Sequence, residues 1–64
     1  GSVTPRPDKD IPHLEVGDLV THDTYGLGTV VDTEGSGQNA VARIKFREEG
    51  VKRILLRFAP VTKL

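Results

Sequence analysis

The chain contains no cysteine, few aromatic residues and no long apolar run. Without cysteine it can form neither a disulfide nor a thiolate metal site, which favours an intracellular protein. No apolar stretch approaches membrane-spanning length and no signal-peptide pattern occurs, so we expect no membrane association. With 64 residues, it makes one domain at most and buries only about 60% of the surface that its unfolded form exposes. A core of that size rarely supplies the water-excluding cleft of an enzyme.

The three aromatic residues are Tyr25, Phe46 and Phe58. Proteins that bind single-stranded nucleic acid stack bases on several exposed rings. We expect Phe46 and Phe58 to lie on core faces, which leaves only Tyr25 for such contacts. The same shortage argues against a methyl-lysine cage, because several rings must converge there on one cation.

The ends of the chain predict its organisation. Residues 1–2 resemble the scar left when an expression tag is removed, and no initiator methionine follows, so we expect a piece of a longer protein. Residues 3–13 hold three prolines among charged residues, a composition typical of a flexible linker. The folded domain is predicted to span residues 14–64.

Four segments of β-branched or alternating apolar residues predict strands, at 18–22, 28–34, 40–46 and 51–58. In the last of them, Ile54, Leu56 and Phe58 share one face, whereas Leu55 lies on the other. No window has helical spacing, so the predicted class is all-β. Short antiparallel strands are expected to curl into a small, strongly bent barrel, since closure removes exposed edges.

The C-terminal tail follows Pro60, which cannot donate to a strand ladder. We therefore expect the last strand to end before it. Residues 59–64 are predicted to form a turn or a short 3₁₀ piece, with Val61 and Leu64 packing over an open end of the barrel.

Charge is distributed unevenly along a chain whose formal net charge is zero. Residues 1–39 hold two basic and seven acidic side chains, whereas residues 40–64 hold seven basic and two acidic ones. Such asymmetry can mark a face for an acidic partner or nucleic acid. Equally, these charges can be the solvated sides of amphipathic strands.

The segment from His22 to Thr29 contains the sharpest local pattern, Tyr25-Gly26-Leu27-Gly28. The glycines are expected to supply special φ angles at a tight turn. Tyr25 and His22 either face a partner or, for Tyr25, cover the edge of the core. The pattern lacks the third glycine and the following helix of a dinucleotide-binding fingerprint, so phosphate cradling is not expected.

Other chemistry-bearing residues do not assemble into a catalytic or metal set. His13 and His22 have no recognised spacing to further ligands, so no metal is expected. Ser36 lies in a predicted loop without a histidine placed to activate it. We expect no catalytic residue and no cofactor in this domain.

Lys52 and Arg53 precede an apolar run in which Leu55 is predicted to point outward. Either the C-terminal tail covers Leu55, or it forms an exposed apolar spot rimmed by cations. The second arrangement would suit a strand or loop of a partner protein.

Two stretches carry a resemblance to a known family: Val16-Gly-Asp-Leu-Val-Thr-His22-Asp-Thr-Tyr25-Gly-Leu-Gly-Thr-Val30, and residues 50–64, which close with Phe58-Ala-Pro-Val-Thr-Lys-Leu64. In these the chain resembles the C-terminal Tudor-like domain of bacterial superfamily 1 DNA helicases of the UvrD/PcrA type. The first stretch is also similar to polymerase-binding modules of the transcription-repair coupling factor and of CarD-type regulators.

The resemblance implies a Tudor-like, Src-homology-3-like barrel tethered behind a helicase motor in the bacterial cytoplasm, associated with the nucleoid. It implies docking on the RNA polymerase β subunit, which links the helicase to transcription and nucleotide excision repair. The family's basic position maps onto Lys52. ATP and Mg²⁺ would belong to the parent motor, and the domain itself would be a monomer.

Two hypotheses follow for function. As a polymerase adaptor, the domain would bind its partner through a set of five residues: Lys52, Arg53, Tyr25, Leu55 and His22. As a nucleic-acid-binding accessory, it would hold DNA or RNA through a basic set: Arg43, Lys45, Arg47 and Arg57. A third alternative is that it packs against its own motor.

Overall fold

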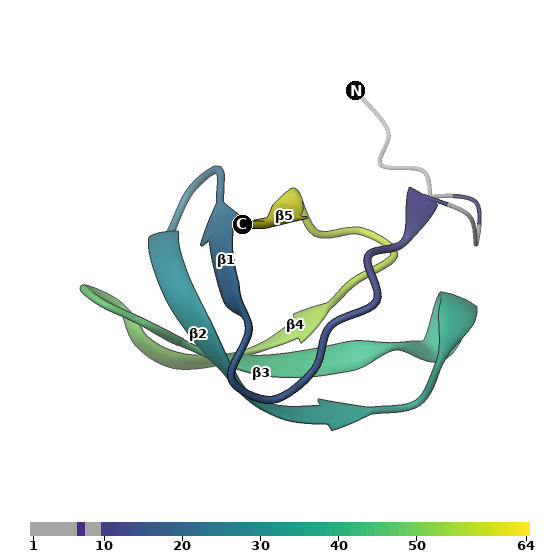
Figure 1. Cartoon of the computed structure of the whole chain (residues 1–64). Coiled ribbons are helices and arrows are strands. Elements are labelled where there is room, and N and C mark those ends of the chain that lie inside the picture. The colour runs from purple at the N-terminus through teal and green to yellow at the C-terminus, as the bar shows by residue number, and fades with distance from the viewer. Residues whose placement is uncertain (1–6, 8–9) are drawn as a thin grey trace.

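The computed structural model describes Pro7 and residues 10–64 (Figure 1). The predicted tag scar and most of the predicted linker lie outside these described residues. The described part of the linker includes Ile11, which packs against the core.

The strands are β1 (Leu19–His22), β2 (Gly26–Glu34), β3 (Val41–Phe46), β4 (Gly50–Leu55) and β5 (Val61–Lys63). They form one antiparallel sheet in the order β4-β3-β2-β1-β5. A 3₁₀ turn, η2 (Gly37–Asn39), lies between β2 and β3. The predicted all-β class is confirmed, and the sheet is bent as expected of a small barrel.

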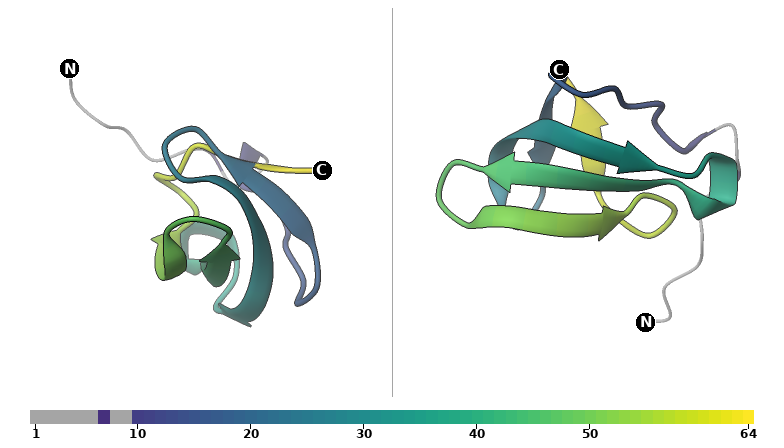
Figure 2. Two further views of the ribbon diagram at one scale, coloured as in Figure 1. Left: turned by 90° about the vertical axis from the view of Figure 1, so that its left-hand side faces the viewer. Right: turned by 90° about the horizontal axis from the view of Figure 1, so that it is seen from below.

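The bend centres on β2, which is long enough to pair with β1 at one end and with β3 along most of its length. Its register with β3 shifts between Val30 and Asp32, so Val31 is an extra residue in the ladder. Such a bulge bends and twists a strand. Figure 2 shows β2, β3 and β4 side by side, with β1 and β5 on the other side of the molecule.

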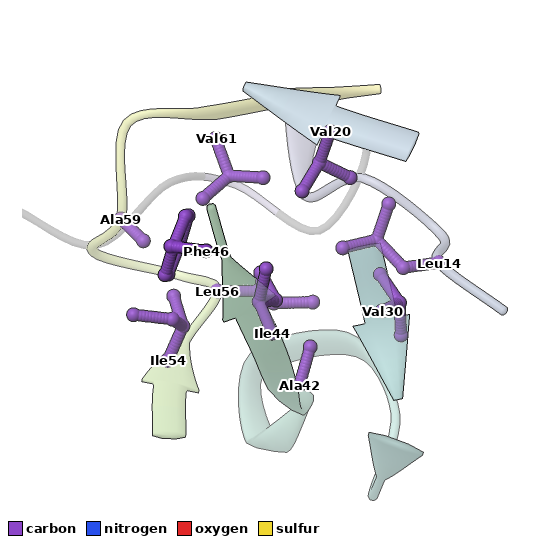
Figure 3. Close-up of a cluster of buried hydrophobic side chains, with 10 residues drawn as sticks. All are labelled: Leu14, Val20, Val30, Ala42, Ile44, Phe46, Ile54, Leu56, Ala59 and Val61. Carbon is purple, nitrogen blue, oxygen red and sulfur yellow. The ribbon is translucent and has the colours of Figure 1, made fainter. Parts of the chain in front are cut away.

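The core fills the space enclosed by the bent sheet (Figure 3). Its buried members are apolar side chains from all five strands and the flanking loops: Leu14, Val20, Val30, Ala42, Ile44, Phe46, Ile54, Leu56, Ala59 and Val61. The predicted strand at 40–46 and the expected position of Phe46 on the core face are therefore correct. We call the core side of the sheet its inner face.

Gly28 is needed for a steric reason rather than for the special φ angle we predicted. It lies opposite Phe46 in the ladder, and a Cβ added there would be 2.5 Å from Ile44 Cγ2 and 2.8 Å from Phe46 Cδ1. Gly26, by contrast, has a φ of +79°, as predicted for the turn. The absence of a side chain at Gly28 lets the Phe46 ring lie directly against β2.

The end of the chain differs from the prediction. β4 stops at Leu55, because residues 56–58 turn and the Phe58 N–H donates to the Leu55 carbonyl at 3.1 Å. Phe58 is consequently 40% exposed instead of lying in the core.

The predicted C-terminal 3₁₀ turn is also wrong. Val61–Lys63 form β5 and pair with β1, since the open edge of β1 offers the ladder partners that a local turn cannot. Val61 is buried as expected, but Leu64 is 67% exposed, because it continues along β1 instead of folding over the barrel end.

Candidate functional site

The turn between β1 and β2 is organised by His22, the last residue of β1. Its Nδ1 accepts hydrogen bonds from the backbone N–H groups of Thr24, at 3.0 Å, and of Tyr25, at 3.2 Å. The imidazole therefore has an unprotonated Nδ1 in this geometry, and it is only 8% exposed. His22 thus fixes the backbone that carries Tyr25 rather than facing a partner itself.

The Tyr25 ring packs against two other rings, those of His22 and Phe46. Its ring stacks on His22, with centroids 4.4 Å apart and planes inclined by 26°. Phe46 contacts both, at 5.3 Å from Tyr25 and 5.8 Å from His22. Tyr25 is partly buried and packs against the core. One part of its side chain therefore covers the edge of the core while the rest is open to a partner.

Lys52 completes this arrangement from β4. It pairs with Ile44, an inner-face residue, and its Nζ lies 4.8 Å from the centroid of the Tyr25 ring. Within the described residues, no carboxylate forms an ion pair with this ammonium. We call His22, Tyr25, Phe46 and Lys52 the cation–ring cluster.

A hollow of about 470 Å³ adjoins the cluster. It is lined by Tyr25 in the β1–β2 turn, by the first two residues of β2 and by two residues of the β3–β4 turn: Gly26, Leu27, Arg47 and Glu48. The Arg47 N–H donates to the Leu27 carbonyl at 3.0 Å, which ties the β3–β4 turn to the start of β2. Tyr25 is thus the member of the cation–ring cluster that lines the hollow.

The five residues predicted to bind a partner protein do not share one face. His22, Tyr25 and Lys52 come together, whereas Arg53 pairs with Arg43 and Leu55 with Val41 on the outer face of the sheet. Leu55 is partly buried. The C-terminal strand pairs with β1 and does not form the cover over Leu55 that we considered.

The basic set predicted for nucleic acid is also divided. Arg43 and Lys45 are exposed on the outer face of β3, and Arg47 lies in the β3–β4 turn. Arg57 is engaged within the domain, because its Nη1 donates to the Gln38 carbonyl at 3.0 Å and its guanidinium lies 5.0 Å from the Phe58 ring centroid.

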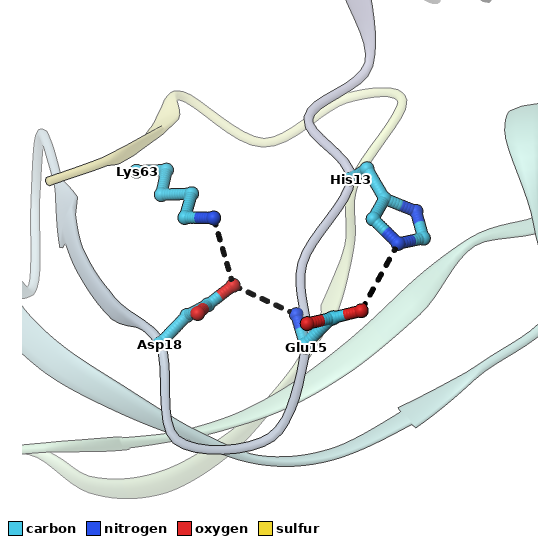
Figure 4. Close-up of polar contacts among 4 residues, drawn as sticks. All are labelled: His13, Glu15, Asp18 and Lys63. Carbon is cyan, nitrogen blue, oxygen red and sulfur yellow. Dashed lines mark hydrogen bonds and ion pairs between the residues drawn. The ribbon is translucent and has the colours of Figure 1, made fainter.

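His13 and Asp18 have local partners at the start of the domain (Figure 4). His13 Nε2 is 3.8 Å from a Glu15 carboxylate oxygen, with both side chains largely exposed. Asp18 Oδ2 accepts the Glu15 N–H at 2.9 Å and lies 3.5 Å from Lys63 Nζ. These contacts, the backbone hydrogen bond above all, hold the pKa of Asp18 below its ordinary value.

A metal site and a membrane span are two kinds of site that can be looked for among the residues that the structure describes. Among them, no group of three or more His, Cys, Asp or Glu side chains is arranged to hold a metal ion. No helix there combines the length and the apolar character needed to cross a bilayer.

The sequence contained one signal for the cluster that we did not use. Alternation in β4 that places Ile54 on the inner face also places Lys52 there, two residues earlier. Arg53 must then point the opposite way. The neighbourhood of Tyr25 was harder to foresee, because it depends on how the β1–β2 turn lies over the end of β4.

Comparison with known proteins gives consistent matches across the folded region. The family model described as the PcrA/UvrD tudor domain matches residues 16–63, which include all five strands. The chain is 41% identical over 70 aligned positions to the ATP-dependent DNA helicase UvrD1 of Mycobacterium bovis, covering 100% of this chain and 9% of that protein.

Two other relatives show the same relation. The ATP-dependent DNA helicase PcrA of Bacillus subtilis is 45% identical over 55 positions, covering 84% of this chain and 7% of the helicase. DNA helicase II of Haemophilus influenzae is 34% identical over 50 positions, with coverage of 78% and 7%. The chain thus spans no more than 9% of the length of these bacterial relatives.

Proposed function

Because the chain belongs to the PcrA/UvrD tudor domain family, we propose that it is a non-catalytic protein-interaction module of a DNA helicase that docks on the RNA polymerase β subunit. The parent helicase would supply ATP hydrolysis and bind Mg²⁺. The domain would then link DNA repair to transcription by holding the motor at the polymerase.

The observation that carries this proposal is the position of Lys52. A lysine ammonium lies over the ring of Tyr25 with no carboxylate partner in the described chain. The ring–cation attraction is worth about 0.5–1 kcal/mol at an exposed site, which biases the Lys52 side chain toward this position. A restrained positive charge beside an open hollow suits a partner that presents a carboxylate.

The strand that carries Lys52 supports a protein partner. β4 stands at one end of the strand order, so one side of its backbone has no neighbouring strand in the sheet. Such edges are templates for an added strand. A polymerase segment could pair with β4 while an acidic side chain reaches Lys52.

The choice of RNA polymerase rests on the resemblance of the β1–β2 region to polymerase-binding modules. That motif contains His22, Tyr25 and the two following glycines. His22 and Tyr25, which stack on each other, are two of the four members of the cation–ring cluster. The polymerase-facing side of the domain is therefore proposed to be the end formed by this turn and β4.

The test is an NMR titration of the ¹⁵N-labelled domain with a fragment of the RNA polymerase β subunit. We expect localised shifts at Tyr25, at the lining of the hollow and along β4. Lys52→Gln should weaken binding roughly tenfold, or about 1.4 kcal/mol.

The matched control is Lys63→Gln, which removes one positive charge from β5 at the other end of the strand order. It should bind like the unaltered domain. Equal losses in both variants would show a general charge effect and contradict the assignment to Lys52. Absence of any shift with the polymerase fragment would contradict the partner.

A further inference from the structure

The open edge of β4 offers backbone hydrogen-bonding groups over a defined length. The Leu56 N–H donates to the Ala40 carbonyl at 3.0 Å, which continues the register of β4 with β3. Alternate residues of an antiparallel strand direct their N–H and C=O groups to the same neighbour. The backbone groups of Val51, Arg53 and Leu55 therefore point away from β3, toward the side of β4 where the described sheet has no further strand.

The turn after β4 closes this edge. The Leu55 carbonyl already accepts the Phe58 N–H at 3.1 Å, so the free backbone groups end at the Leu55 N–H. Figure 2 shows the chain curling at the end of β4 before it crosses to β5. A strand added to β4 would therefore run from beside Val51 to the turn at residues 56–58, about 13 Å along the strand.

Phe58, in this turn, carries an exposed ring that the domain holds in place. The residue is 40% exposed, whereas its neighbour Ala59 is buried. The Arg57 guanidinium lies 5.0 Å from the centre of the Phe58 ring, and Arg57 Nη1 donates to the Gln38 carbonyl at 3.0 Å. A side chain whose position is already restricted loses less conformational entropy on binding, and aromatic residues are enriched in protein interfaces.

Two contacts between a cation and a ring thus flank the open edge. Lys52 lies over Tyr25 in the first half of β4, and Arg57 lies over Phe58 just after its end. Arg57 is engaged with the Gln38 carbonyl, whereas Lys52 has no carboxylate partner in the described chain. The Lys52 end therefore suits a carboxylate, and the other end presents the Phe58 ring, which suits an apolar side chain.

We propose that the open edge of β4 binds an extended protein segment as an added strand, with an acidic side chain at Lys52 and a large aliphatic side chain on Phe58. Four residues separate Lys52 from Leu56, where the turn begins, and an even spacing places both partner side chains on one face of their strand. A second copy of this chain fits less well, because pairing of two β4 strands brings Lys52 and Arg53 close to the same cations of the copy. The inference rests on the docking site proposed at Lys52 and adds to it the conformation of the partner and a second anchor, Phe58.

The experiment is an NMR titration of the ¹⁵N-labelled domain with a synthetic peptide, Thr-Glu-Thr-Val-Thr-Ile-Thr, blocked at both ends. We expect shifts at the amides of Val51, Arg53 and Leu55, which gain acceptors, and at Phe58. Phe58→Ala should weaken binding of this peptide about fivefold. A second peptide, with threonine in place of isoleucine, should bind the Phe58→Ala variant and the unaltered domain equally. The matched control is Leu64→Ala, which removes an exposed apolar side chain beyond β5 and should leave binding of both peptides unchanged.

Several outcomes would overturn the proposal: no shift along β4 at millimolar peptide, equal losses in the Phe58→Ala and Leu64→Ala variants, or a loss in Phe58→Ala that is the same for both peptides. Shifts of the β4 amides when the domain alone is concentrated would assign the edge to a second copy instead. Proton–nitrogen spectra of each variant verify that the fold is retained.

The titration with the peptide contains no polymerase, so its failure leaves polymerase docking standing, and absence of binding to the polymerase fragment leaves the result with the peptide intact. The two proposals also separate on the polymerase fragment itself. Binding that is weakened by Lys52→Gln but unchanged by Phe58→Ala would retain the docking site and contradict the second anchor.

Discussion

The Lys52 ammonium lies 4.8 Å from the centre of the Tyr25 ring, which in turn stacks on His22. The two residues come from elements that are not neighbours in the sheet order, β4 and the turn between β1 and β2. Their contact therefore exists only when the sheet is folded and bent. Any measurement that follows this contact reports on the fold and on the proposed docking site together, so variants must separate the two.

Substitutions of Tyr25 make that separation. Tyr25→Phe keeps a ring beneath the ammonium and should retain binding to the polymerase fragment within about threefold. Tyr25→Leu keeps apolar bulk but removes the ring, so Lys52 loses its restraint and binding should weaken about fivefold or more. Isothermal titration calorimetry gives both affinities. Equal binding by the Leu and Phe variants would show that the ring contact has no role in recognition.

His22 is expected to matter for stability through its acceptor nitrogen. His22→Phe keeps a ring against Tyr25 but leaves the N–H groups of Thr24 and Tyr25 without their acceptor. We expect a loss of about 1–3 kcal/mol in the free energy of unfolding, measured by urea denaturation. His22→Asn, which retains a short acceptor, should recover part of this loss. If the Phe variant is as stable as the original, the two hydrogen bonds contribute nothing.

Acid should weaken the anchorage of β5 through Asp18. Its pKa is lowered in the folded state by the Glu15 N–H and, secondarily, by Lys63, so the folded protein prefers the ionised form. The resulting stability is fully present above the ordinary pKa of aspartate, about 3.9, and is lost as pH falls through the lower, folded-state pKa.

The test compares the original chain with Asp18→Asn in urea denaturation across this acidic range. The variant should be less stable at neutral pH, and the difference between the two chains should shrink as pH falls. A difference that stays constant with pH would mean that the Asp18 charge is not linked to folding.

Gly28 is predicted to tolerate no side chain. In Gly28→Ala the new methyl group would collide with Ile44 and Phe46, both buried, and overpacking of this kind costs about 1–3 kcal/mol. Val31→Ala, on the same strand but 42% exposed at the bulge, should change stability by no more than about 0.5 kcal/mol. Urea denaturation of both variants checks this contrast, and undiminished stability of the Gly28→Ala variant would refute it.

The fold was predictable where local pattern decides it. The alternation of Ala42, Ile44 and Phe46 could be satisfied only by a strand with one buried face, and it is correct. The C-terminal strand was missed because residues 61–63 gain their partners from β1, some forty positions earlier in the chain. Pro60 predicts the end of the strand expected at 51–58, but the turn at residues 56–58 already ends β4 at Leu55. Pro60 also carries no information about a strand that begins after it.

The candidate site was predictable in its members and not in its arrangement. Lys52, Tyr25 and His22 were identified from the motifs, and the structure brings them together. Arg53 was grouped with them by adjacency in sequence, although neighbours in a strand point to opposite faces. Its actual partner, Arg43, follows only from the register of β3 with β4.

The Arg43–Arg53 pair is predicted to limit the stability of the sheet, because the two like charges are direct cross-strand partners. Arg53→Glu places an acid opposite Arg43, replacing a repulsion with an attraction that is worth about 0.2–1 kcal/mol in a cross-strand position. The free energy of unfolding should therefore rise, most clearly at low salt, and it should rise less in Arg53→Gln, which removes the repulsion without supplying the attraction. Urea denaturation at two salt concentrations measures both variants. If Arg53→Glu is no more stable than Arg53→Gln at low salt, the two positions do not interact electrostatically across the strands.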